Sequence, residues 1–345
     1  MTRFIHQTDL FHPHGDPDDH WDLATVYALA VQGYLDLRGI LLDYPPDHRA
    51  GDPAVMAVAQ LGSLTGVTGV PVAIGTMNPM RHRRDAQCDT DPANRAASEW
   101  LCRMLDESPE PMVINIVGSC TDVAVAGLME PDLFKAKCKA IYLNAGSAYP
   151  GETGVLEYNV RLNPGSYAAV FDLPCPVYWC PCWHQTESYQ VGPYGTWYSF
   201  IQGDIMRGLS DPLCNYFLYA LSRSPDPKYL RYLTMPVDSP LREDCGQYPR
   251  SMWSTPGILH AAGMGIDVHS GLLPERQIKN PVFRFKPIRI TCADDGNTTW
   301  QLTEENTERY IFSLSHPDLY ATVMTTALCK LLSGIGRPGK PDTDD

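Results

Sequence analysis

The chain has 345 residues, which suits one large α/β domain or two smaller ones. Hydrophobic residues make up 44% and charged residues 19%, so a sizeable core can form and global disorder is disfavoured. The formal net charge of −13 disfavours nucleic acid as a partner, because a phosphate backbone attracts Lys and Arg.

Short apolar runs alternate with helical patterns through the first half of the chain. The runs predict strands at Arg3–Gln7, Leu37–Leu42, Val70–Ile74, Met112–Val117, Ala140–Leu143 and Val177–Cys180. Apolar residues at helical spacing predict helices at His20–Gly33, Pro53–Leu64, Pro92–Leu105, Thr121–Met129 and Pro164–Phe171. This alternation predicts an α/β fold, a mostly parallel sheet with flanking helices and right-handed crossovers.

A polar residue followed by proline precedes several predicted helices, which is typical of an N-cap and the first helical position. The pairs are Asp16-Pro17, Asp52-Pro53, Asp91-Pro92 and Asn163-Pro164.

The second half has a different pattern. Residues 183–280 are rich in Tyr, Trp, Pro and Gly, and we expect them to cover the sheet and wall a pocket. Their helical patterns lie at Asp211–Leu221 and Gly257–Gly265. Residues 282–303 predict a β-hairpin added near the C-terminus, followed by a helix at Pro317–Leu332 and a frayed tail over 336–345. With no sharp break in composition, we expect one domain over 1–345 whose core is 1–182.

The first residues become polar too early for a secretion signal, and no segment approaches the roughly 18 unbroken apolar residues of a membrane helix. The eleven cysteines are scattered, so we expect reduced, mostly buried thiols. These patterns predict a cytoplasmic protein without a membrane partner.

The first chemical motif is an acidic stretch. Five carboxylates and three histidines lie between residues 9 and 22, where a strand is expected to end and a helix to begin. Because carboxylates repel one another, this collection indicates a hard cation. Helix capping and the helix dipole offer another explanation for Asp16, Asp18 and Asp19, but not for Asp9.

The second motif is Glu157-Tyr158-Asn159. In an extended segment, Glu157 and Asn159 point to the same side, and an acceptor beside an amide suits the vicinal hydroxyls of a sugar. An ordinary pair of loop residues is the alternative.

Together the motifs resemble those of the calcium-dependent nucleoside hydrolases, the inosine-uridine preferring ribohydrolase family. Asp9 and the pair Asp18-Asp19 resemble its opening aspartate motif. The Glu157 motif, followed by Asn163-Pro164 and the run 168–171, resembles its second motif, and the segment 114–126 resembles a strand and turn between them.

The resemblance implies hydrolysis of an N-glycosidic bond by water that a calcium ion activates and an aspartate deprotonates. It assigns Asp9 as base and metal ligand, with Asp19 as a second ligand. It also assigns a backbone carbonyl as a ligand, and Val117 or Gly118 is the closest match. It assigns Asp18, Glu157 and Asn159 to the sugar. It also implies a small nucleoside-like substrate and a homodimer or homotetramer.

The chain departs from the family pattern at several positions. Asp43 stands nearest to an expected asparagine, and His260 stands where the family has the aspartate of a late His-Asp pair, which makes it a candidate metal ligand. Imidazole suits zinc, iron or manganese better than calcium, so another divalent cation or no metal remains an alternative. The region around His184 corresponds to one that approaches the family's pocket, so His184 or Glu187 is a candidate substrate contact.

Three weaker signals have structural alternatives. Cys180, Cys182 and His184 could bind zinc, but buried thiols fit the spacing better. The basic run 81–84 could form salt bridges with a neighbouring subunit, bind phosphate or form a solvated loop. The aromatic residues between 183 and 200 could stack on a base or pack as a wall.

These patterns predict a hydrolase of ribonucleosides or related N-ribosides. A nucleoside- or sugar-binding descendant without catalysis, and a hydrolase of another glycoside, are the alternatives.

Overall fold

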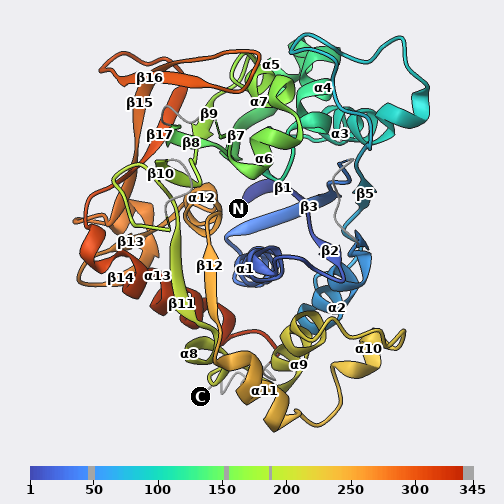
Figure 1. Cartoon of the computed structure of the whole chain (residues 1–345), viewed down its shortest axis with the longest axis vertical. Coiled ribbons are helices and arrows are strands. Elements are labelled where there is room, and N and C mark those ends of the chain that lie inside the picture. Colours follow the sequence, from blue (N-terminus) through green and yellow to red (C-terminus); the bar gives the residue numbers. More distant parts are fainter. Residues whose placement is uncertain (46–50, 151–154, 186–188, 337–345) are drawn as a thin grey trace.

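The computed structural model describes residues 1–45, 51–150, 155–185 and 189–336. Within these residues the main sheet has nine strands in the order β16-β15-β17-β9-β7-β6-β1-β3-β5 (Figure 1). The strands are β1 (Thr2–Thr8), β3 (Leu35–Leu42), β5 (Val72–Ile74), β6 (Met112–Val117), β7 (Cys138–Asn144), β9 (Val177–Trp179), β15 (Phe283–Cys292), β16 (Thr298–Leu302) and β17 (Arg309–Leu314). Neighbours from β5 to β17 are parallel, whereas β15 and β16 are antiparallel.

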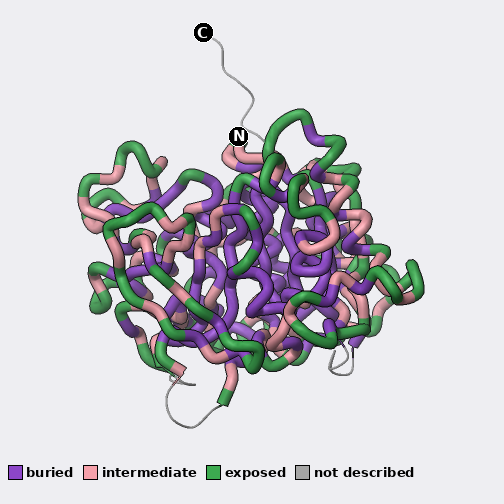
Figure 2. The backbone as a smooth tube through the Cα atoms, turned by 90° about the horizontal axis from the view of Figure 1, so that it is seen from above, coloured by how far each residue is buried: buried purple, intermediate pink, exposed green. Residues whose placement is uncertain are grey.

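Helices cover both faces of this sheet, as the strand–helix alternation predicts. One hydrophobic cluster joins one face to α1 (Asp18–Val31), α2 (Val55–Thr65), α9 (Asp211–Leu221), α12 (Thr255–Ala261) and α13 (Pro317–Leu332). The other joins the opposite face to α3 (Ala96–Asp106), α4 (Thr121–Met129), α5 (Pro131–Lys137) and α7 (Pro164–Val170). The sheet therefore forms the buried centre of the molecule (Figure 2).

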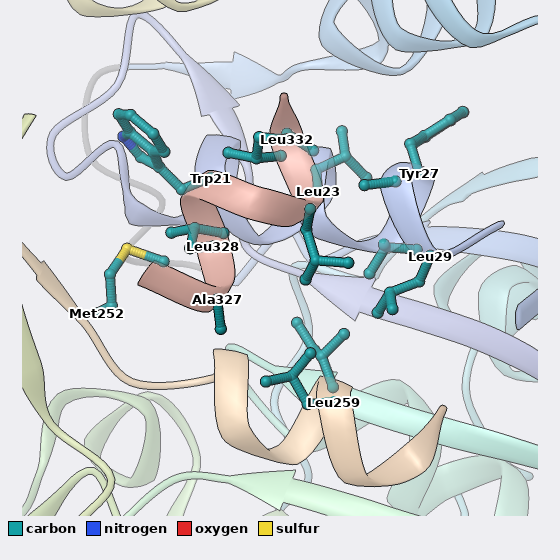
Figure 3. Close-up of a cluster of buried hydrophobic side chains, with 14 of the residues drawn as sticks. Trp21, Leu23, Tyr27, Leu29, Met252, Leu259, Ala327, Leu328 and Leu332 are labelled. Atoms are coloured by element: carbon teal, nitrogen blue, oxygen red, sulfur yellow. The ribbon is translucent and has the colours of Figure 1, made fainter. Parts of the chain in front are cut away.

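Helix α1 is the centre of the first cluster. Trp21 and Leu23 are fully buried, and α1 contacts both α12 and α13. Figure 3 shows Leu23 of α1 beside Leu259 of α12 and Leu328 of α13. The helix that carries the acidic motif is thus held by apolar packing on two sides.

The chain order of the strands creates a switch point at β1. The chain passes from β1 to β3 and β5 on one side, and then returns to β6, β7 and β9 on the other. The carboxyl ends of β1 and β6 therefore diverge into different crossovers, which opens a crevice where ligands bind in open α/β sheets.

The remaining elements lie around this core. They comprise the short strands β2 (Phe11–His12), β4 (Asp52–Pro53), β8 (Ser147–Tyr149), β10 (Trp183–Gln185), β11 (Tyr198–Ile201), β12 (Pro249–Met252), β13 (Met264–Asp267) and β14 (Gly271–Pro274). They also include η1 (Pro92–Arg95), α6 (Tyr158–Leu162), α8 (Gln202–Met206), α10 (Tyr229–Tyr232), α11 (Ser239–Gly246) and η2 (Glu275–Gln277). None of the described helices is both long and apolar enough to cross a membrane.

Several sequence predictions need correction. The helix predicted from Pro53 begins at Val55, and Asp52–Pro53 instead pair with β2 as a short strand. The helix predicted over Gly257–Gly265 instead spans Thr255–Ala261, and strand β13 begins at Met264. Strand β17 was not predicted, and through it the C-terminal hairpin joins the main sheet rather than standing apart. The predicted tail lies outside the described residues apart from Gly336.

Two of the four predicted caps are confirmed. The Asp91 side chain accepts from the N–H of Ala93, and the Asn163 side chain accepts from that of Ser166. Asp16 does not cap α1, because Pro17 occupies the N-cap position.

Candidate functional site

A cavity of about 330 Å³ opens at the switch point, which is a size typical of small-molecule sites. Its lining combines carboxylates, amides and aromatic rings. The lining residues are Asp9, Asp16, Asp18, Asp19, Val117, Asn144, Glu157, Tyr158, Asn159, Cys182, Trp183, Tyr189, Trp253 and Ser254. Six of the nine residues that the sequence singles out therefore lie together.

The acidic edge of the cavity is built by β1 and α1. Asp9 follows the last residue of β1, and Asp18 and Asp19 form the first turn of α1. The hydroxyl of Thr8 donates a hydrogen bond to Asp19 Oδ1 at 2.6 Å, which fixes the helix start to the strand end.

These carboxylates repel one another. Burial raises the pKa of Asp18 well above its ordinary value, and the charges of Asp16 and Asp9 add to the rise. Burial and the charges of Asp9 and Asp18 raise the pKa of Asp19 in the same way. The guanidinium of Arg250 opposes this for Asp18, and it also lies 2.8 Å from the Asp16 carboxylate. The site therefore favours the arrival of positive charge.

The turn after β6 brings a backbone segment against Asp9. Gly118 has φ +121°, and a Cβ there would lie 2.9 Å from Asp43 Oδ2 and 3.0 Å from Asp9 Cβ, so the close approach needs glycine. The buried side chain of Gln7 fixes this turn, because its Oε1 accepts from the N–H of Val117 and its Nε2 donates to the carbonyl of Ser119.

Asp43 lies behind this turn. It follows β3, is 4% exposed, and accepts hydrogen bonds from the N–H and hydroxyl of Ser119 at 2.7 and 2.9 Å. Burial raises its pKa, and the charges of Asp122 and Asp9 contribute. Asp43 is not among the lining residues, and its contacts support the turn rather than face the cavity.

Glu157 and Asn159 reach the cavity through a geometry that the sequence interpretation missed. They do not lie in an extended segment, because Glu157 is the N-cap of α6. Its carboxylate accepts the N–H groups of Asn159 at 2.9 Å and Gly146 at 2.7 Å. Burial raises its pKa, and these backbone donors oppose the rise.

A polar network crosses the central strands beneath the cavity. The amide of Asn144 donates to Asn115 Oδ1 at 2.9 Å, and the amide of Asn115 lies 3.1 Å from His6 Nδ1. Burial lowers the pKa of His6 to about 3, so the ring is neutral and accepts this bond. Asn144 lines the cavity, and its backbone carbonyl accepts a hydrogen bond from Asn159 Nδ2 at 3.3 Å.

Aromatic rings form another wall. Trp183 packs edge-to-face against Tyr189 at 4.7 Å and against Trp253 at 5.5 Å between ring centroids. Trp253 and Ser254 directly precede α12, so this helix start reaches the cavity. An aromatic-rich segment was the available sequence signal, but it did not distinguish lining rings from packed ones.

His260 lies away from this wall. Its Nδ1 is 2.6 Å from the Tyr142 hydroxyl, its Nε2 is 3.5 Å from Glu275, and its ring packs on Phe285. It is absent from the cavity lining, because the helix starts at Thr255 and His260 falls further along it. We therefore leave His260 out of the proposed site.

The other histidines also lie outside the lining. His184 contacts the ring of Tyr149 edge-on, at 5.5 Å, and Glu187, the alternative candidate, lies outside the described residues. His12 bonds the carbonyl of Ser224, while His14 and His20 contact each other. They do not join the carboxylates around the cavity.

The weaker sequence signals have structural explanations. Cys180 and Cys182 are buried free thiols. Arg81 pairs with Asp85 and Asp89, and Arg83 pairs with Asp172.

The cavity offers donor atoms that suit a divalent cation. Asp9, Asp18, Asp19 and the backbone at Val117 offer oxygen, which suits a hard cation such as calcium. The mutual repulsion of the carboxylates is relieved by positive charge. Among the described residues, however, no three His, Cys, Asp or Glu side chains already stand as a ligand set. The donor chemistry fits, and the ligand positions are not preassembled.

The comparisons with known proteins identify the family of the chain. The model of the family described as inosine-uridine preferring nucleoside hydrolase matches residues 14–222, which is more than half of the chain. The chain belongs to this family. The match includes Asp18, Asp19, Glu157 and Asn159, and it ends before the segment that carries Trp253.

Individual members of the nucleoside hydrolase family are distant. The pyrimidine-specific ribonucleoside hydrolase RihA of Citrobacter koseri is 25% identical over 178 residues, covering 47% of this chain and 56% of that protein. The chain thus matches about half the length of this curated relative. RihA of Escherichia coli gives the same identity and coverage.

Solved structures share the family fold over a larger range. A purine-preferring ribonucleoside hydrolase from Gardnerella vaginalis superposes with a TM-score of 0.59 at 14% identity, covering 96% of this chain and 99% of that one. The plant nucleoside hydrolase PpNRh1 has a TM-score of 0.52 at 16% identity, with the same coverage. At these identities the likeness concerns the fold alone.

Proposed function

We propose that the chain hydrolyses the N-glycosidic bond of ribonucleosides or related N-ribosides. The observation that carries the proposal is the meeting of Asp9, Asp18 and Asp19 with Glu157 and Asn159 in one cavity at the switch point. Membership of the nucleoside hydrolase family supports it.

A divalent cation, with calcium as the first candidate, would be held by Asp9, Asp19 and the backbone carbonyl of Val117. When bound, it supplies positive charge that makes water more acidic and anchors hydroxyl groups.

The polar side chains of the cavity have separate roles in the reaction. Cleavage passes through an oxocarbenium-like state, so positive charge develops on the sugar ring. Asp9 accepts the proton of the attacking water. Asp18, Glu157 and Asn159 bind ring hydroxyls. The negative charge of Glu157 stabilises the positive ring, and three backbone N–H groups fix the position of its carboxylate.

The aromatic wall suits the leaving group. Trp183, Tyr189 and Trp253 offer flat apolar faces and edges to a heterocyclic base. We further expect a nucleoside-sized substrate, a homodimer or homotetramer, and a cytoplasmic location.

The direct test is sugar release from a panel of ribonucleosides and 2′-deoxyribonucleosides, assayed with added calcium and with excess chelator. We expect ribose release that the chelator abolishes. A folded protein that releases no sugar from any nucleoside at any metal tested would contradict the proposal.

A binding protein without catalysis is the second candidate. It is favoured by the start of α12, where the described lining offers Trp253 and Ser254 rather than an imidazole and a carboxylate. Tight binding of a nucleoside without turnover would support this alternative, and turnover of a different glycoside would support a changed substrate.

A further inference from the structure

A buried carboxylate behind the cavity is not used by the proposed chemistry. Asp22 lies one turn beyond Asp18 in α1, is fully buried, and does not line the cavity. Burying a carboxyl group among apolar residues costs free energy unless it makes specific hydrogen bonds. Its neighbours Trp21 and Leu23 pack in the core, so an apolar residue would satisfy the packing here.

The partners of Asp22 come from the start of α12. The hydroxyl of Thr255 donates to Asp22 Oδ1 at 3.2 Å, and the hydroxyl of Tyr198 donates to Thr255 Oγ1 at 3.0 Å. Burial raises the pKa of Asp22 to about 7, and the hydrogen bond from Thr255 opposes the rise. All of these side chains are buried, so the chain of bonds is shielded from water.

This chain of bonds links two walls of the cavity. Asp22 belongs to the helix that presents Asp18 and Asp19, whereas Thr255 directly follows Trp253 and Ser254. Apolar packing alone, such as Leu23 beside Leu259 in Figure 3, tolerates small sliding of one helix on another. Directional hydrogen bonds at the start of α12 fix the position of this helix against α1.

We propose that Asp22 and Thr255 form a positioning pair that sets Trp253 and Ser254 against the carboxylates of α1. The proposal rests on the proposed function for its effect on substrate, but its geometry can be tested without turnover. Neither residue touches the substrate, and both act through the residues that line the cavity.

The test uses the full chain labelled with 5-fluorotryptophan, with the Trp253 fluorine signal assigned through Trp253→Phe. Thr255→Val and Asp22→Ala are expected to move the Trp253 signal. Thr255→Ser and Asp22→Asn, which keep the hydroxyl and the acceptor, are expected to restore it. With an accepted nucleoside, Thr255→Val is expected to raise KM about tenfold with a smaller change in kcat.

Thr25→Val is the matched control. Thr25 is buried in the same helix and donates its hydroxyl to the carbonyl of Trp21 at 2.8 Å, so its replacement removes a hydrogen bond that lies within α1 and does not involve α12. We expect this variant to lower Tm without moving the Trp253 signal. If Thr255→Val moves that signal no more than Thr25→Val does, the pair is merely structural and the proposal is overturned. A wild-type chain without hydrolysis would refute the proposed function, while the fluorine signals would still decide this inference.

Discussion

At the scale of single residues, Asp9 is the carboxylate whose charge acts on several other carboxyl groups of the site. It contributes to the raised pKa values of Asp18, Asp19, Asp43 and Glu157. The repulsion between Asp9 and these four carboxyl groups disfavours the folded state. A catalytic role therefore explains the position of Asp9 better than a contribution to stability does.

Asp9→Asn is therefore expected to separate activity from stability. Turnover should fall by about 10²- to 10⁴-fold, because the variant cannot accept the proton of water. Tm should stay the same or rise, because the variant removes a repelling charge. Steady-state kinetics and thermal unfolding measure the two effects, with the exposed Asp132→Asn on α5 as control. Full turnover in Asp9→Asn would exclude the proposed base.

Arg250 supplies positive charge at the edge of the same cluster, through its ion pair with Asp16. Arg250→Met is expected to lower Tm in the absence of divalent cations, because two carboxylates lose their partial neutralisation. Calcium should then raise Tm more in the variant than in the wild type, since binding to the folded state stabilises it and the competing charge is gone.

Thermal unfolding over a calcium titration measures this difference. Arg207→Met, which removes the exposed ion pair with Asp204, is the control and should not change the response to calcium. If calcium leaves Tm unchanged in both proteins, the cluster does not bind it.

At the scale of elements, strong local patterns were predictable. The bounds of β6, α4, α9 and α13 agree with the sequence patterns, because an apolar run or a helical stripe of sufficient length leaves few alternatives. Strand β17 escaped prediction, since long-range contacts support it. Its Arg309 donates hydrogen bonds to the carbonyls of Phe171, Leu173 and Cys175, far away in the chain.

Asp267, the last residue of β13, gives a prediction about the pH dependence of stability. Asp267 is buried and accepts backbone N–H groups of His269, Ser270, Lys279 and Asn280, which lower its pKa from 3.8 to about 2. Because the folded pKa lies below the unfolded one, the carboxylate stabilises the fold fully above pH 3.8 and loses this effect as pH falls toward 2.

Asp267→Asn should therefore be less stable than the wild type at pH 7, and the difference should shrink on acidification. Urea unfolding at pH 7, 4 and 3 measures it. A difference that is constant across this range would show that the charge of Asp267 is not responsible.

At the scale of the whole molecule, the site arises from topology. Asp9 was recognisable because it follows a short apolar run, and Glu157 because its motif resembles that of a family. Their meeting depends on the strand order around β1, which brings the ends of β1, β6 and β7 to one crevice. The start of α12 was not predictable in this way, because Trp253 and Ser254 carry no motif and reach the cavity through packing of α12 on α1.

The central claim is that water attacks the sugar carbon of a nucleoside in this cavity. The measurement that tests it most directly is hydrolysis of an accepted nucleoside in water enriched in oxygen-18, with the released sugar reduced by borohydride at once, before its anomeric oxygen exchanges with water, and with mass analysis of both products. The account predicts one oxygen-18 in the released sugar and none in the base. Label in the base, or no cleavage of any nucleoside by the folded protein, would contradict it.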